Sequence, residues 1–94
     1  AKAFEVHGPR LLVPYTADQT FDARAAFGRD APLILEIGFG MGTATAHIAQ
    51  VRPQDDFLCC EVHEPGVGSL LKLAGDAGLN NIRIVQHDAV EVMD

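Results

Sequence analysis

The 94-residue sequence has no long hydrophobic run, no leader-like amino terminus and few basic residues. A membrane-spanning helix needs about 18 consecutive apolar residues, and no stretch approaches that length. A secretory leader needs charged, apolar and small-residue segments in that order, which the amino terminus does not have. We therefore expect a soluble, cytoplasmic protein with no membrane partner.

Basic residues are scarce. Seven Lys and Arg residues stand against 13 Asp and Glu residues, which gives a formal net charge of -6. This charge has the wrong sign for a domain that holds nucleic acid by phosphate contacts alone. If a nucleic acid is a substrate, its basic binding surface lies elsewhere. The acidic balance suits a small cationic ligand, although many soluble proteins are equally acidic for other reasons.

Cysteine is nearly absent, and the two cysteines, Cys59 and Cys60, are adjacent. Adjacent cysteines cannot staple distant parts of a chain, which excludes a secreted disulfide scaffold. They follow Phe57 and Leu58 in an apolar run, where cysteine acts as a small buried hydrophobe. We favour this interpretation over a metal or redox role, because no partner Cys or His pair has ligand spacing. No metal site is expected.

The length and the apolar fraction of 48% are those of one small globular domain. The pattern changes after residue 31. Residues 1–31 are expected to be an irregular, partly ordered lead, punctuated by Gly8-Pro9 and Val13-Pro14, with a short helix within residues 20–29. Residues 32–94 are expected to form the amino-terminal half of a ligand-binding domain.

Residues 32–94 alternate between strand and helix patterns. Short aliphatic runs bounded by turn residues predict strands buried on both faces. The predicted strands are Leu33–Ile37, Asp56–Val62 and Ile82–Gln86. Apolar spacing at i, i+3, i+4 and i+7 predicts the helices between them.

The first predicted helix begins at Thr43 and ends before Pro53, and the second begins at Pro65 and ends at a left-handed Gly78. A third begins within residues 89–94. The predicted apolar face of the first helix consists of Ala44, Ile48 and Val51. That of the second helix consists of Val67, Leu70, Leu71 and Ala74.

Strands that alternate with amphipathic helices favour parallel pairing with right-handed crossovers. The predicted fold class is therefore α/β, with a partial doubly wound, Rossmann-like parallel sheet of three strands and flanking helices. Ligands of such sheets bind beyond the carboxyl ends of the strands, so the residues at those ends are the candidates for a site.

The first strand runs into three alternating glycines, Gly38, Gly40 and Gly42. Glycine lets the backbone turn tightly and approach a ligand closely, and free N–H groups lie at the following helix start. A tight turn without a ligand is the alternative. Thr43 stands where a dinucleotide fingerprint requires glycine, which disfavours NAD or FAD. Glu36 would repel a pyrophosphate and attract an ammonium group.

Two further acids close the next strands. Glu61 lies 19 residues beyond Gly42, where a carboxylate can accept hydrogen bonds from both hydroxyls of a ribose. A solvated strand-end carboxylate is the alternative. Asp88 ends the third strand and could accept from an adenine amino group or cap a helix. Together with Glu36, these acids describe a ligand with amine, ribose and adenine parts.

Four segments resemble the bacterial tRNA (guanine-N7-)-methyltransferases, a family of class I S-adenosylmethionine-dependent enzymes. The glycine segment indicates only a class I methyltransferase, whereas the segment that begins at Glu61 is far more specific. The resemblance covers about two thirds of the chain, from Leu33 onward. The segments are Glu36–Gly42, Glu61–Gly68, Leu79–Arg83 and Asp88–Val92.

The resemblance implies a cofactor, a reaction and a partner. The cofactor is S-adenosylmethionine, and the reaction is methyl transfer to N7 of a guanine in the tRNA variable loop, a step of tRNA processing. The motifs that frame the target base have no counterpart here, so the catalytic residues are expected beyond Asp94 and the chain alone is expected to be inactive. The implied cofactor-binding residues are Glu36, Gly38, Gly40, Gly42, Glu61, Val62, Asp88 and Ala89, with the His63 backbone also lining the adenosine pocket.

Two alternatives stay open: a module that binds S-adenosylmethionine without catalysis, and a class I methyltransferase with another acceptor. We interpret His63 as a scaffold residue rather than a catalytic one. Gly66 and Gly68 are expected to permit close helix packing. The family's first strand is central in its sheet, so an unpaired first strand here predicts self-association as a dimer or an aggregate, or a chain of marginal stability.

Overall fold

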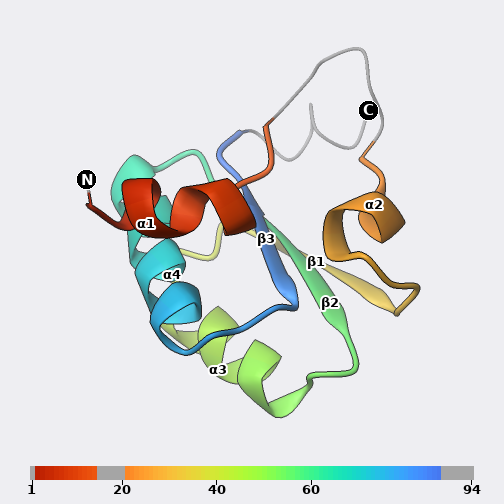
Figure 1. Ribbon diagram of the computed structural model, residues 1–94. Coiled ribbons are helices and arrows are strands. Elements are labelled where there is room, and N and C mark those ends of the chain that lie inside the picture. The colour runs from red at the N-terminus through yellow and green to blue at the C-terminus, as the bar shows by residue number, and fades with distance from the viewer. Residues whose placement is uncertain (1, 15–20, 88–94) are drawn as a thin grey trace.

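The computed structural model describes residues 2–14 and 21–87 (Figure 1). Within these residues the sheet has three parallel strands in the order β1-β2-β3. The register of the first pair places Ile37 beside Cys60, so β1 and β2 end at the same edge of the sheet. The strands are β1 (Leu33–Ile37), β2 (Asp56–Cys60) and β3 (Ile82–Val85).

Four helices in the described residues accompany the sheet and confirm the predicted α/β class. Helices α3 (Thr43–Val51) and α4 (Glu64–Asp76) connect the strands, and α1 (Lys2–Leu11) and α2 (Ala23–Phe27) precede them. Figure 1 shows α1, α3 and α4 on one side of the sheet and α2 on the other. No helix in the described ranges is long and apolar enough to cross a membrane.

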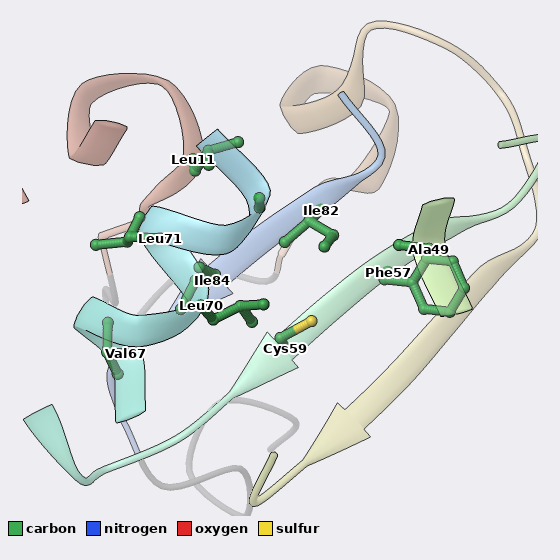
Figure 2. Close-up of a cluster of buried hydrophobic side chains, with 10 residues drawn as sticks. Leu11, Ala49, Phe57, Cys59, Val67, Leu70, Leu71, Ile82 and Ile84 are labelled. Atoms are coloured by element: carbon green, nitrogen blue, oxygen red, sulfur yellow. The ribbon is translucent and has the colours of Figure 1, made fainter. Parts of the chain in front are cut away.

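Strand β2 is buried along its whole length because helices or loops cover both of its faces. Phe57 and Cys59 belong to the larger core cluster, which Figure 2 shows between the sheet and α4. Leu58 and Cys60 point to the opposite face and pack with Val85. Both cysteines are free thiols in apolar surroundings, which confirms their predicted role as small core residues.

Helix α4 follows its sequence pattern closely. The four residues of its predicted apolar face are all fully buried. Gly78 has a φ of 68°, and the amide of Leu79 donates to the carbonyl of Ala74 at 3.0 Å. This is the left-handed helix end that the glycine predicted.

The bounds of α3 are as predicted, but the prediction of its buried face was wrong. Ile48 and Val51 are 39% and 62% exposed, and Ala44 is also exposed. The buried residues are instead Thr45 and Ala49. Small side chains let α3 lie close to the sheet and α4, and a search for large apolar residues cannot detect such a face.

Strands β2 and β3 are shorter than predicted. β2 ends at Cys60 rather than Val62 because the Glu61 carboxylate accepts the amides of Val62 and His63, which takes those residues out of the ladder. β3 ends at Val85, one residue early. The helix predicted within residues 89–94 lies outside the described residues.

The amino-terminal lead is more regular than predicted. Residues 2–11 form α1, and Leu11 is fully buried against the core of the domain. Leu12 then forms a parallel bridge with Ile84. The Gly8-Pro9 pair lies inside α1, so its interpretation as a break was wrong. Contacts with α4 stabilise this helix, and the local sequence does not reveal them. The short helix predicted within residues 20–29 is present as α2.

Strand β1 lies at an edge of the sheet as far as the structure describes it. Ile34 packs against the core, whereas Leu33, Leu35 and Ile37 point to the other face and are 44%, 36% and 59% exposed. This strand therefore presents both a free backbone edge and an apolar face.

Candidate functional site

The turn between β1 and α3 is built on Gly38, Gly40 and Gly42. Their φ angles are 63°, 65° and 84°, in the left-handed region that residues with a β-carbon rarely adopt. The amide of Gly38 donates to the carbonyl of Cys60 at 2.9 Å, which joins the turn to the end of β2. The predicted tight turn thus has a conformation that requires glycine.

The first two glycines of this turn leave open space above the backbone. A β-carbon placed on Gly38 or Gly40 would meet no atom within 4 Å. A β-carbon on Gly42 would lie 2.7 Å from Cβ of Leu70. Gly38 and Gly40 therefore offer bare backbone to a ligand, whereas Gly42 lies against α4.

Glu61 begins the connection after β2 and reaches back to the glycine turn. Its Oε1 accepts a hydrogen bond from the amide of Gly40, and its Oε2 accepts from the amides of Val62 and His63, each at 3.1 Å. These bonds, first among them the one from His63, lower the pKa of the Glu61 carboxyl. The side chain is thus a fixed carboxylate beside the open backbone.

The remaining acceptor capacity of Glu61 limits what it can bind. A carboxylate has about four lone-pair positions, and three are used here. One donor can therefore join Oε1 without displacing another. A second donor requires the release of one amide, and Gly40 is the one that is not a near neighbour of Glu61 in the chain.

Glu36 is the second predicted acid that the structure describes. It is half-buried near the end of β1, and the buried hydroxyl of Thr45 lies 3.4 Å from its Oε1. Because β1 and β2 end side by side, Glu36 and Glu61 lie at neighbouring strand ends on either side of the turn. The sequence did not single out Thr45, since nothing in its pattern says that it faces Glu36.

His63 is the N-cap residue of α4. Its carbonyl accepts the amides of Gly66 and Val67 at 3.0 and 3.2 Å. This position agrees with a scaffold role for the residue. Asp88 and Ala89, the other two predicted binding residues, lie outside the described residues.

Gly66 and Gly68 both have packing reasons for being glycine, as predicted. A β-carbon on Gly66 would overlap the carbonyl oxygen of Gly40. A β-carbon on Gly68 would lie 3.3 Å from Cε1 of Phe4, on α1. The contact of Gly66 with the glycine turn was not predicted, because the two segments are distant in sequence.

A cavity of about 320 Å³ lies at the opposite, amino-terminal ends of the strands. Arg29, Pro53 and Asn81 are among its lining residues. It is separate from the glycine turn and forms no part of the candidate site.

Sequence comparisons with known proteins place this chain in a family. A family model described as "Putative methyltransferase" matches residues 30–94. Proteins named tRNA (guanine-N(7)-)-methyltransferase from Paracidovorax citrulli (strain AAC00-1) and Acidovorax sp. (strain JS42) are 72% and 69% identical to the whole chain. A third, from Verminephrobacter eiseniae (strain EF01-2), is 66% identical over 102 residues.

The aligned region covers 100% of this chain and 37% of each of these three relatives. The family match extends from the loop before β1 through the glycine turn, Glu61 and α4, so it includes every described residue of the candidate site. The chain therefore belongs to this methyltransferase family.

Proposed function

We propose that this chain binds S-adenosylmethionine and supplies the cofactor-binding part of a tRNA (guanine-N7-)-methyltransferase. The observation that carries the proposal is the Glu61 carboxylate, fixed by three amides beside the open backbone of Gly38 and Gly40. Relatives that are 72% and 69% identical to this chain bear that enzyme's name, which supports the choice of reaction.

The described residues fit the parts of this cofactor. Glu61 would accept a ribose hydroxyl, and Glu36 would attract the ammonium group of the methionine moiety. Gly38 and Gly40 would lie beneath the cofactor, where a side chain would fill the space. Val62 would line the adenosine pocket through its backbone. Gly42, Asp88 and Ala89 complete the proposed set of binding residues.

Bound S-adenosylmethionine supplies a methyl group on a sulfonium centre. Guanine N7 has an in-plane lone pair and no proton, so no residue has to act as a general base. The task of this chain would be alignment: Glu36 and Glu61 would hold the cofactor at two points and so orient the methyl donor. Their negative charges also favour a cationic ligand. We assign no catalytic residue among residues 1–94.

The proposed partner is tRNA, as the substrate of the intact enzyme. A net charge of -6 does not suit a domain that holds tRNA by its phosphates, so we propose that the basic surface lies outside these 94 residues. The similar proteins are bacterial, and tRNA in a bacterium is cytoplasmic, so we propose a cytoplasmic location.

Cofactor binding is tested by calorimetric titration with S-adenosylhomocysteine. Glu61→Ala should weaken binding by about 10- to 100-fold, because it removes charge-assisted hydrogen bonds. Glu64→Ala is the matched control, since Glu64 is an exposed acid three residues away, and it should bind like the wild type. Absence of binding by the wild type, or equal binding by Glu61→Ala, would contradict the proposal.

The reaction is tested with a chimera in which this chain replaces the aligned 94 residues of the Paracidovorax citrulli relative. We expect the chimera to transfer methyl groups to guanine N7 of a tRNA transcript. The same chimera with Glu61→Ala should lose activity at subsaturating cofactor. A folded chimera that binds cofactor but methylates no tRNA would favour a binding module instead.

We also propose that the 94-residue chain self-associates through β1. An antiparallel pair of β1 strands centred on Leu35 places Leu33 opposite Ile37, and Ile34 opposite Glu36, so no like charges meet. The same pairing would give hydrogen-bond partners to the N–H and C=O groups on the free edge of β1. It would also join two exposed apolar faces.

A further inference from the structure

The glycine turn lies on α4 at two successive points. The carbonyl oxygen of Gly40 fills the space that a side chain of Gly66 would need, and the side chain of Leu70 fills the space that a side chain of Gly42 would need. Gly40 and Gly42 are two residues apart in the turn, and Gly66 and Leu70 are one helical turn apart on α4. The face of α4 therefore serves as a platform that sets the height of the turn above the sheet.

A third attachment comes from Glu61, which accepts the amide of Gly40. The Cγ of Glu61 would also lie 3.6 Å from a β-carbon on Gly66. Gly40 is thus held through its carbonyl side by contact with Gly66 and through its N–H by a hydrogen bond to Glu61. Neither attachment depends on a ligand.

Helix α4 is itself fixed from its other side. Phe4 of α1 contacts Gly68, and His7 of α1 occupies the space beside Gly75. Leu70 and Leu71 are fully buried in the core. Helix α4 therefore cannot easily shift to make room for an added side chain at the turn, because packed interiors resist displacement.

We propose that Gly66 is a positioning residue for the cofactor site: it lets the Gly38–Gly42 turn settle at the height at which Gly40 meets Glu61, before any ligand binds. This inference rests on the proposed function only for the identity of the ligand. A side chain at position 66 displaces the carbonyl of Gly40, lifts the turn into the open space above it and separates the Gly40 amide from Glu61.

The test compares Gly66→Ala with Gly68→Ala. Both add one methyl group to α4, but the second faces Phe4 of α1 rather than the turn. Gly66→Ala should weaken S-adenosylhomocysteine binding by at least about tenfold, as overpacking against backbone predicts, while Gly68→Ala stays within about threefold of the wild type. Urea unfolding of both variants separates a loss of binding from a loss of the fold.

A second measurement, hydrogen exchange, needs no cofactor, and its first part needs no variant. In the ligand-free wild type, the backbone amide of Gly40 should exchange its hydrogen with solvent much more slowly than an exposed turn amide, because Glu61 holds it. In a folded Gly66→Ala variant, that protection should fall. An unprotected Gly40 amide in the wild type, or a folded Gly66→Ala that binds like Gly68→Ala, would overturn the inference. A wild type that does not bind S-adenosylhomocysteine but protects Gly40 would count against the proposed function alone.

Discussion

The side-chain amide nitrogen of Asn81 lies 2.9 Å from the carbonyl oxygen of Ala49, and so joins the start of β3 to the last turn of α3. The same nitrogen lies 3.1 Å from the carbonyl of Arg52 and 3.0 Å from that of Asp55. The side chain is buried, and it supplies a second donor to carbonyls that also accept from Arg52, Asp55 and Arg29. This residue of the Leu79–Arg83 segment thus acts at the opposite end of the sheet from the candidate site.

Replacement of Asn81 should therefore lower stability without direct damage to the site. Asn81→Ala should reduce the free energy of unfolding by about 1–3 kcal/mol, because it removes the buried N–H donors that tie β3 to the end of α3. Asn81→Asp should cost more, since it places a negative charge against these carbonyls. Asn80→Ala, at an exposed neighbour, should cost less. Urea unfolding of the three variants would measure this order, and equal losses for Asn80→Ala and Asn81→Ala would contradict the assignment.

The Glu61 carboxyl should make stability depend on pH in a defined direction. Its pKa is lowered in the folded chain from an ordinary value of 4.5, mainly by the His63 amide. The unfolded state therefore takes up protons first as the solution is acidified. The stabilisation is complete above pH 4.5 and is lost as the pH falls through the lower, folded-state pKa.

Glu61→Gln cannot titrate and tests this linkage. Near neutral pH it should be less stable than the wild type by about 1 kcal/mol, a value that allows for the partial exposure of the side chain. Urea midpoints measured in steps below pH 4.5 should show the two proteins converging. A difference that stays constant or widens on acidification would mean that the carboxylate is not held as the structure shows.

Local pattern predicted the parts of the fold that depend on chain neighbours. The bounds of β1 follow from an aliphatic run that ends at Gly38, and the buried face of α4 follows from large residues at helical spacing. The proximity of the glycine turn to Glu61 could be predicted because parallel strands end at one edge of a sheet. The negative charge of Glu61 and the backbone freedom of the glycines can be read directly from the residue types.

The rest depends on contacts between segments far apart in the chain. The buried face of α3 consists of small residues, Thr45 and Ala49, whose burial is set by how closely the helix approaches the sheet. Helix α1 contains Gly8-Pro9 and forms against α4, so its local sequence argues against it. The contact of Gly66 with Gly40 joins two segments that are distant in sequence, and no periodicity shows that they lie close together in space.

The two cysteines should be unreactive in the folded protein. Burial raises the pKa of both thiols, and the negative charge of Glu36 adds to the effect on Cys59. The thiolate is the reactive form, so both access and ionisation are suppressed. With a disulfide reagent such as Ellman's, native labelling should be at least about a hundredfold slower than in denaturant, where both thiols react. Rapid labelling of one thiol under native conditions would show that its strand is open.

Strand β1 should determine the association state of the chain. Leu35 lies at the centre of its exposed apolar face, and lysine on an edge strand opposes edge-to-edge pairing. In the proposed antiparallel pair, Leu35→Lys would bring two introduced positive charges face to face. It should raise the dissociation constant by at least about tenfold.

Sedimentation velocity over a range of protein concentrations would measure this change. Val6→Lys is the matched control, because Val6 is an exposed apolar residue of α1, away from the strand edge, and its replacement should leave the association unchanged. A wild type that stays monomeric at every concentration would refute self-association. Equal association of the wild type and Leu35→Lys would instead show that the interface does not include β1, since like charges at the centre of a strand pair are destabilising.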